Sequence, residues 1–295
     1  MKKKGLFVGL TTIDLQFLVN TYPEPNTKIK AANYEINIGG PAANAAIAFS
    51  YLGGECHILS GIGNNHFSDF IKSEYEKFNI EITDITPNYK SDPTFATIIT
   101  TDMTGDRTVF SYKPNNETNE FINLNKINLN NIDIVLIDGF HGNAAFEIAK
   151  KATELNIPVV YDGGSWKNRS SDILNYTKIA ICSDDFYPPG CSDKQEVLKF
   201  LAEEKGIERV AITRGRDSIV YMKRDLKGKV EIYKPDVVDT LGAGDIFHGA
   251  FCYYYANNYS FEDSLKQASR IASESCKFFG TRSWMEGRNV DEKKH

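Results

Sequence analysis

A carboxylate follows a glycine-rich turn at residues 239–245 (DTLGAGD), where a predicted strand passes into a predicted helix. Gly242 and Gly244 can adopt positive φ and let the backbone approach a ligand closely. A helix that begins near Ala243 would point free N–H groups and its positive dipole end at an anion. Asp245 could then accept the proton of an attacking hydroxyl while the amides bind a phosphate. The alternative is a plain strand–turn–helix with an acidic residue at the helix start, since short glycine motifs have many false matches.

A second glycine turn, NIGGPAANAA at residues 37–46, lies at another predicted strand-to-helix junction. The chain has no G-x-x-x-x-G-K-[ST] sequence, which excludes a P-loop enzyme, and GIGNNH at 61–66 lacks the spacing of a dinucleotide-binding loop. Two such junctions far apart in the chain suggest one site with two halves. One half would bind a polar small molecule and the other a nucleotide phosphate.

Short apolar segments alternate with helix-like segments along most of the chain, and these elements must position the two turns. The strand-like segments occupy 5–11 and 56–63, and four more begin at residues 132, 157, 178 and 209. The helix-like segments occupy 41–54, 66–79, 143–155 and 194–206. This alternation predicts an α/β fold with a mostly parallel sheet and helices on both faces. We expect residues 1–295 to form a single domain.

Two segments, 13–38 and 94–112, alternate apolar and polar residues like half-exposed antiparallel strands, and the second contains the hairpin signal MTGDRT. They predict a small inserted antiparallel β lid over the C-terminal ends of the parallel strands, where open α/β sheets bind ligands. We expect its outer face and its edges to remain exposed and to carry apolar residues. These include Phe17, Ile36, Ile98 and Val109. Exposed edges and apolar faces of this kind predict a homodimer that pairs through the lid.

Composition narrows the class of protein further. The formal net charge is −5 with both signs interspersed, so no basic stripe points to nucleic acid. The five cysteines are widely spaced and form no C-x-x-C pair, which predicts reduced thiols rather than a zinc site or a disulfide framework. The apolar stretch after MKKK is too short for a signal-peptide core or a membrane span, so we expect a cytoplasmic protein without membrane contact.

The two glycine turns together resemble the signatures of the ribokinase-type (PfkB) carbohydrate kinases, and the resemblance runs essentially end to end. DTLGAGD matches that family's C-terminal signature and GGPAANAA its N-terminal one. The segments DLQFLVNTYPEPN, GDRT and VDTLGAGDIFHGA are most similar to ketohexokinase and sulfofructose kinase. The resemblance implies a ribokinase-like fold and transfer of the γ-phosphoryl group of ATP to a primary hydroxyl of a sugar, with a ketose as the acceptor. It also implies Mg²⁺ and leaves open a monovalent cation such as K⁺.

Residue by residue, the resemblance makes Asp245 the catalytic base and places Gly242, Ala243 and Gly244 in the anion hole around the transferred group. It assigns sugar contacts to Asp14, Asn26, Gly39, Gly40, Asn44 and Arg107. Asp14 is placed at the end of the first strand, and without the family the alternative is a strand-end aspartate that caps a turn. Arg107 could equally be a solvated charge on a hairpin. Asn44 is a poor helix former inside an alanine-rich helix, which favours a functional role.

For the nucleotide, ITRGRDS resembles the family's Thr-x-Gly turn and indicates Thr213 and Gly215. In ICSDDF the chain departs from the Asn-x-x-Glu of ribokinases, and Ser183 takes the asparagine position. Asp185 is the candidate Mg²⁺ ligand there, because Mg²⁺ prefers hard oxygen ligands. His248, one helical turn after Asp245, is interpreted as structural. A nucleoside kinase of the same family and a non-catalytic sugar or nucleotide sensor are the alternative functions.

Overall fold

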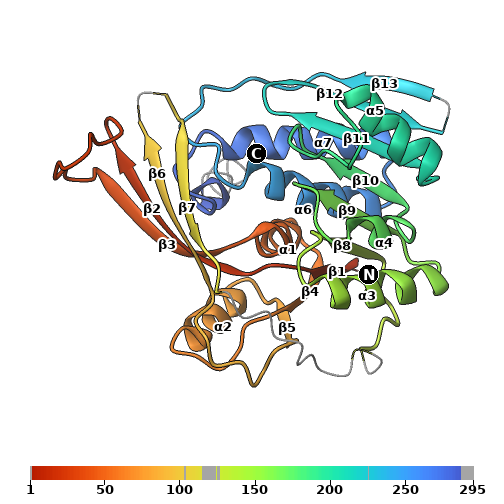
Figure 1. The fold of residues 1–295 in the computed structure, drawn as a ribbon, viewed down its shortest axis with the longest axis horizontal. Coiled ribbons are helices and arrows are strands. Elements are labelled where there is room, and N and C mark those ends of the chain that lie inside the picture. Colours follow the sequence, from red (N-terminus) through yellow and green to blue (C-terminus); the bar gives the residue numbers. More distant parts are fainter. Residues whose placement is uncertain (1, 103, 115–123, 125–126, 225, 287–295) are drawn as a thin grey trace.

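A nine-stranded sheet forms the centre of the protein in the computed structural model, which describes residues 2–102, 104–114, 124, 127–224 and 226–286. Its strand order is β13-β12-β11-β10-β9-β8-β1-β4-β5 (Figure 1). Seven strands run parallel: β1 (Lys4–Val8), β4 (Glu55–Ser60), β5 (Glu81–Asp84), β8 (Ile134–Ile137), β9 (Val159–Gly163), β10 (Ile179–Cys182) and β11 (Arg209–Arg214). Two antiparallel strands, β12 (Asp217–Lys223) and β13 (Leu226–Val230), complete one edge. The predicted mostly parallel sheet is confirmed.

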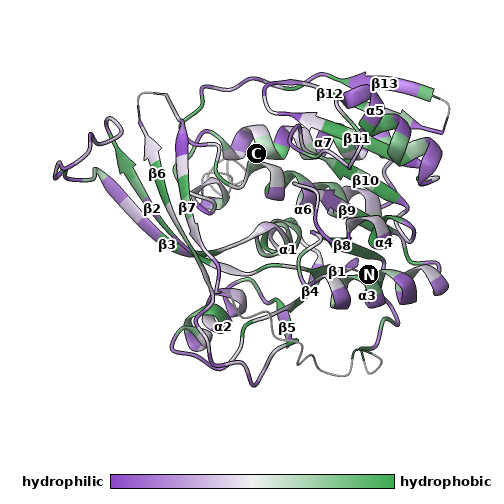
Figure 2. Cartoon of the chain, in the orientation of Figure 1, coloured by the Kyte–Doolittle hydropathy of each residue, from purple (hydrophilic) through white to green (hydrophobic). Residues whose placement is uncertain are grey.

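Helices cover both faces of this sheet, because its central strands are apolar on both sides. In β1, Phe7 belongs to one hydrophobic cluster while Leu6 and Val8 belong to the other. The first cluster contains residues of α1 (Pro41–Tyr51), α2 (Ser68–Glu76), α6 (Ala243–Ala256) and α7 (Phe261–Ser275). The second contains residues of α3 (Gly142–Glu154), α4 (Ser170–Leu174), α5 (Lys194–Lys199) and the π-helix η2 (Phe200–Glu204). Figure 2 shows the same division, with hydrophobic central strands and hydrophilic outer helix faces.

A separate four-stranded sheet, the lid, lies beside this body in the order β3-β2-β6-β7 (Figure 1). Its strands are β2 (Thr12–Val19), β3 (Asn33–Gly39), β6 (Thr94–Thr101) and β7 (Arg107–Tyr112). The pairs β2–β3 and β6–β7 are antiparallel, as expected, but the central pair β2–β6 is parallel. The reason is connectivity: β2 follows β1 and β6 follows β5, so both strands leave the body in the same direction. Met103, within the predicted hairpin turn, lies outside the described residues.

The apolar residues of the lid are distributed over its two faces differently from the prediction. Directly paired residues share a face, and Gln16, Ile98 and Val109 are paired across three strands. Ile98 is fully buried, so this is the inner face, and the prediction that Ile98 is exposed is wrong, whereas Val109, on the edge strand β7, is 49% exposed as predicted. The alternation of a strand fixes the spacing of each face but not which set faces inward. The outer face carries Phe17 and Ile36, as predicted.

Candidate active site

The glycine-rich turn ends where predicted, and α6 begins at Ala243 with no side chain capping its N-terminus. Gly242 has φ +68°, and a Cβ there would lie 2.8 Å from Cγ2 of Thr281, so the turn requires glycine. Gly244 differs from the expectation, since it lies within α6 and is not among the residues with positive φ. A Cβ on Gly244 would meet no protein atom within 4 Å. The packing therefore does not require this glycine, whereas close approach of an anion to the helix N-terminus would.

Asp245 lies half-buried in the first turn of α6, close to that N-terminus. Nδ2 of Asn44 donates a hydrogen bond of 2.8 Å to its Oδ2. Burial, and secondly the charge of Asp162, raise the pKa of Asp245 to about 7, while the bond from Asn44 and the nearby His248 oppose the rise. A carboxylate with this pKa is well matched to general-base chemistry near neutral pH.

Asn44 joins the two glycine turns, because it lies in α1, directly after the first turn, and bonds to Asp245 in the second. Its Oδ1 accepts a hydrogen bond of 2.9 Å from Nη1 of Arg282, and Nη2 of Arg282 donates to the carbonyl of Ile38 at 2.7 Å. Burial lowers the pKa of Arg282 to about 10, and the charges of Asp14 and Glu74 oppose that shift. Sequence reasoning missed Arg282, which lies outside both signatures near the end of the described chain.

Asp14 lies near the start of β2 in the lid, not at the end of the first strand as expected, because β1 ends at Val8. Its carboxylate accepts a hydrogen bond of 2.5 Å from Oγ1 of Thr12. Burial raises its pKa, and the charge of Arg282 opposes the rise. A Cβ on Gly39 would lie 1.9 Å from Oδ2 of Asp14, so this glycine makes room for the carboxylate.

Gly40 serves a different purpose from Gly39. It has φ +97°, and a Cβ there would lie 2.4 Å from the carbonyl oxygen of Leu10. The chain after β1 therefore crosses directly over the start of α1, which only glycine permits. Both glycines of the first turn are explained by the protein's own packing, and this packing brings Asp14 beside the start of α1.

Asp239, the first residue of the glycine-rich run, connects that run to the lid. Nε2 of Gln16 in β2 donates to Oδ2 of Asp239 at 2.5 Å and to the hydroxyl of Thr100 in β6 at 2.8 Å. The backbone N–H groups of Leu241 and Gly280 also donate to Asp239, at 3.0 and 2.9 Å. The inner face of the lid is thus bonded to the turn that precedes Asp245.

Arg107 and Asn26 have different positions in the lid. Arg107 is exposed on β7, and its guanidinium donates to the hydroxyl of Thr240, within the glycine-rich run. Asn26 has φ +63° and is exposed in the loop between β2 and β3. Figure 1 shows this loop at the end of the lid that points away from the body. The structure therefore brings Arg107 to the site but not Asn26.

The nucleotide candidates lie at the carboxyl ends of two neighbouring parallel strands, β10 and β11. Ser183 follows β10, and its hydroxyl donates to the carbonyl of Gly164 at 2.8 Å. Thr213 in β11 donates to the carbonyl of Cys182, and Gly215 has φ +57° in the turn that follows. The backbone N–H of Asp185 donates to the Ser183 hydroxyl at 3.2 Å, and the Asp185 side chain is exposed.

Asp162 and His248 form a buried pair between the two halves of the site, and sequence reasoning did not assign Asp162. Nδ1 of His248 lies 3.5 Å from Asp162 and 2.7 Å from the carbonyl oxygen of Gly244, and Nε2 lies 3.1 Å from that of Ile181. These contacts hold the imidazole between the first turn of α6 and the end of β10, with the carboxylate of Asp162 beside it. The signal that could have found Asp162 is its place at the carboxyl end of a predicted parallel strand.

The carboxylates of Asp162 and Asp185 are the oxygen ligands that fit a metal ion on the nucleotide side. Oδ1 of Asp162 lies 4.0 Å from a Cβ built on Gly164. The carbonyl of Gly164 accepts the hydrogen bond from Ser183, so Asp162 lies near the nucleotide candidates at the carboxyl ends of the strands. No group of three or more His, Cys, Asp or Glu residues that could hold a metal occurs among the described residues. One or two carboxylates suffice for Mg²⁺, which takes its other ligands from phosphates and water.

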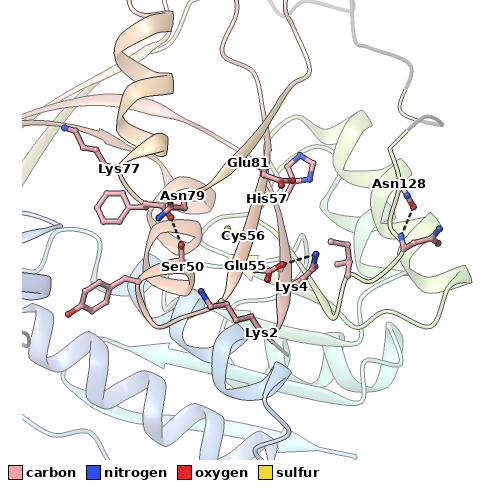
Figure 3. Close-up of a pocket in the computed structure, with 16 residues that line it drawn as sticks. Lys2, Lys4, Ser50, Glu55, Cys56, His57, Lys77, Asn79, Glu81 and Asn128 are labelled. Atoms are coloured by element: carbon pink, nitrogen blue, oxygen red, sulfur yellow. Dashed lines mark hydrogen bonds and ion pairs between the residues drawn. The ribbon is translucent and has the colours of Figure 1, made fainter. Parts of the chain in front are cut away.

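Two cavities lie at opposite ends of the strands of the nine-stranded sheet. One, of about 570 Å³, is lined by Leu10 and Thr11, which follow β1, and by Gly139 and His141, which follow β8. The other, of about 510 Å³, lies where β1 and β4 begin, and Figure 3 shows Lys4 and Glu55 paired on its wall. Of these two cavities, the first lies at the carboxyl ends of the strands, where the candidate residues also lie. In the described part of the chain no helix is long and apolar enough to cross a membrane.

The chain is similar over most of its length to several known proteins. Residues 2–287 match the model of the pfkB family carbohydrate kinases. Ketohexokinase from Mus musculus is 23% identical over 288 residues, which cover 93% of this chain and 96% of that protein. Nucleoside kinase from Methanocaldococcus jannaschii is 26% identical over 272 residues, which cover 86% and 84%. The solved structure of ribokinase from Thermotoga maritima matches with a TM-score of 0.76 at 24% identity, covering 99% of this chain and 100% of that one.

Proposed function

The chain belongs to the pfkB family of carbohydrate kinases, phosphotransferases that act on sugar hydroxyl groups, and from this premise we propose its reaction. It transfers the γ-phosphoryl group of ATP to a primary hydroxyl of a sugar, with a ketose as the acceptor. Kinases of this family use ATP and Mg²⁺. The observation that carries the proposal is the position of Asp245, in the first turn of a helix whose N-terminus has no side-chain cap.

The chemistry assigned to these residues is general-base catalysis with charge stabilisation. Asn44 holds Oδ2 of Asp245, and Oδ1 is the atom that we assign to the proton of the acceptor hydroxyl. The N–H groups at the start of α6 stabilise the negative charge of the transferred group, since phosphoryl transfer depends mainly on positioning and electrostatics. When bound, Mg²⁺ would neutralise charge on the phosphates, and Asp162 and Asp185 are the residues that would hold it.

Support for a sugar acceptor comes from Asp14 beside Gly39, at the base of the lid. A carboxylate there can accept hydrogen bonds from sugar hydroxyl groups, and Arg107 closes on the same site from β7. The choice of a ketose rests on the sequence pattern and on the similarity to ketohexokinase from Mus musculus. The similarity to a nucleoside kinase favours the second candidate, a nucleoside acceptor.

The test is a panel of acceptors with Mg·ATP: fructose, other ketoses, ribose, deoxyribose and adenosine. We expect the highest kcat/KM with a ketose and phosphorylation at a terminal carbon, identified by NMR of the product. Asp245→Asn should lower kcat by about 10²-fold or more while the fold is retained. Selective turnover of adenosine would establish the nucleoside kinase instead. Binding of sugar without turnover of any acceptor would indicate a sensor.

A cytoplasmic location and a homodimer are part of this proposal. The location is supported by the use of ATP as the phosphoryl donor. The dimer is supported by the outer face of the lid, where Tyr34, Ile36, Phe110 and Tyr112 are between 49% and 64% exposed. An apolar face of this kind on a small sheet fits a second copy of the same face, since two-fold pairing is the commonest closed assembly. Replacing K⁺ by Na⁺ in the assay tests the predicted effect of a monovalent cation.

A further inference from the structure

A buried carboxylate, Asp138, directly follows β8 and is not among the groups assigned to the reaction. Asp138 is 1% exposed. Its Oδ2 accepts hydrogen bonds from the backbone N–H groups of Leu10 at 2.8 Å and Ala42 at 3.1 Å. Its Oδ1 accepts one from the N–H of Phe140 at 2.9 Å. Three segments therefore meet at one carboxylate: the loop after β1, the first turn of α1 and the loop after β8.

The bond from Ala42 caps helix α1 from outside the helix. Gly40, the residue before the helix, has no side chain that could accept a hydrogen bond, and Pro41 at the first position has no N–H. The N–H of Ala42 is thus the first free donor of α1. A carboxylate at this end also interacts favourably with the helix dipole. Asp138 therefore supplies the capping acceptor that the residues around Gly40 lack.

The bond from Leu10 holds the chain that crosses over this helix start. A Cβ on Gly40 would lie 2.4 Å from the carbonyl oxygen of Leu10, while the N–H of Leu10 is bonded to Asp138. A Cβ on Gly9 would lie 2.1 Å from Cγ of Asp138, so the backbone there is packed directly against the carboxyl group. The first glycine turn is thus packed against a segment that Asp138 holds in place.

Helix α1 connects this anchor to the proposed base. Asn44 lies in the first turn of α1, since its N–H bonds to the carbonyl of Gly40 at 2.9 Å. Its side-chain amide donates to Asp245 at 2.8 Å. Asp138 bonds only to backbone N–H groups, and none of them belongs to Asn44 or Asp245. An effect of Asp138 on catalysis must therefore pass through the position of the helix start.

An ionised carboxylate is the acceptor that these three donors require. Burial raises the pKa of Asp138 to about 6, and the bond from Leu10 opposes the rise, so the group is ionised at about pH 8. A carboxylate has acceptors on both oxygens, whereas an asparagine would turn its NH₂ group toward at least one N–H. Asp138→Asn therefore loses at least one of the bonds. It also removes the cost of a buried charge, so we expect it to fold.

We propose that Asp138 is a positioning residue of the kinase reaction, which holds the start of α1 and the loop after β1 so that Asn44 orients Asp245. This inference rests on the proposed function, in which Asp245 is the base. Both oxygens of Asp138 are already bonded to the protein's own backbone, so its role does not require contact with either substrate.

A second aspartate in the same sheet provides a matched control. Asp84, the last residue of β5, accepts bonds from the N–H groups of Ile62 at 3.0 Å, Gly63 at 3.0 Å and Thr86 at 2.9 Å. These bonds are of the same kind as those of Asp138, but they join the loops after β4 and β5 and do not reach α1. Asp84→Asn therefore removes similar bonds without releasing the helix that carries Asn44.

The kinetic test is a double-mutant cycle with the best acceptor, at about pH 8. We expect Asp138→Asn to lower kcat/KM for the acceptor about tenfold or more. The KM for ATP should change by less than about twofold, because the nucleotide candidates follow β10 and β11. In the Asn44→Ala background the same substitution should lower kcat/KM by about twofold or less, since the residue through which it acts is absent. Asp84→Asn should have the same effect in both backgrounds.

Hydrogen exchange of the Asn44 side-chain amide gives a readout that does not need turnover. Its NMR signal is identified by its loss in Asn44→Ala. We expect exchange to be about tenfold faster in Asp138→Asn and unchanged in Asp84→Asn. Asp138→Ser, which keeps one short acceptor, is the second variant, and thermal unfolding shows which variants are folded.

Unchanged exchange of the Asn44 amide in Asp138→Asn would overturn the inference. An equal loss of kcat/KM with and without Asn44 would also overturn it. If neither Asp138 variant folds while Asp84→Asn does, the role of Asp138 is purely structural and the inference fails. Near-normal turnover by Asp245→Asn would instead overturn the proposed base, and the exchange measurement would still show whether Asp138 positions Asn44.

Discussion

The side-chain amide of Asn44 donates a 2.8 Å hydrogen bond to Asp245, so helices α1 and α6 are joined at the proposed base itself. The oxygen of the same amide accepts a bond from Arg282. A guanidinium can only donate, so Arg282 determines which end of the Asn44 amide faces Asp245. Residues from the beginning and the end of the chain therefore orient one carboxylate.

Replacing Arg282 tests this arrangement. Arg282→Met leaves the oxygens of Asn44 and Ile38 without their donor, which should cost about 1–3 kcal/mol of unfolding free energy. We expect kcat to fall about tenfold, because the Asn44 amide is then free to turn away from Asp245. Arg282→Lys should restore part of the rate. Arg270→Met, on the exposed face of α7, is the control and should leave kcat unchanged. An unchanged kcat in Arg282→Met would show that Asn44 is held without it.

The pKa of Asp245 predicts how the rate depends on pH. Its value of about 7 means that the carboxylate is lost as the pH falls through 7. We expect kcat/KM to be constant above about pH 8 and to fall about tenfold per pH unit below about pH 6. A profile that is flat down to pH 5 would contradict the assignment of Asp245 as the base.

Asn44 should move that acid limb. The hydrogen bond from Asn44 opposes the rise in the pKa of Asp245, so its loss in Asn44→Ala should raise the pKa further. We expect the acid limb of kcat/KM to shift to higher pH by about one unit. Asn257→Ala, at the far end of α6, removes an exposed amide and should leave the limb in place. A shift toward lower pH would contradict the role of this bond.

Asp245→Asn should make the protein more stable although it inactivates it. The pKa of Asp245 is raised in the folded state, so the folded protein binds more protons than the unfolded chain between the ordinary pKa of 3.8 and about 7. Stability therefore decreases as the pH rises through that range, and this cost is fully present above pH 7. Asparagine has no carboxylate to ionise, so the variant does not have this cost. We expect a gain of about 1–3 kcal/mol at pH 8 and a smaller gain at pH 4.5, measured by denaturant unfolding. An equal gain at both pH values would refute the linkage.

The sequence predicted the elements of the fold well, because their signals are local. Alternating strands and helices, the two glycine turns and the start of α6 at Ala243 all depend on neighbouring residues. Contacts between distant segments could not be read in this way. Arg282 belongs to no motif, and its partner Asn44 lies 238 residues away. The prediction that Ile98 is exposed was also wrong, because a strand's period of two does not say which of its two faces is covered.

The site followed the same rule. Asp245 and Asn44 were identified by their motifs, and the structure brings them into contact. Gly39 was predicted to admit a sugar, but the structure gives it a second reason, because it makes room for Asp14. Asp162 was missed because an aspartate at a strand end has no signature until the neighbouring strands are placed.

The outer face of the lid predicts the oligomeric state. Phe110 is 56% exposed on the edge strand β7 and is paired with Thr97, in the same row across the outer face as Leu15 and Ile36. A charge at Phe110 would have to be buried without a partner if two lids pack together, so Phe110→Asp should dissociate the dimer. Light scattering at micromolar concentration should give a dimer for the wild-type protein and a monomer for this variant. Tyr259→Asp, at an exposed tyrosine on the body, is the control and should remain dimeric. The hydrogen bond between Gln16 and Asp239 connects the lid to the site within one chain, whatever the oligomeric state. A monomeric mass for the wild-type protein, with and without sugar, would refute pairing through the lid.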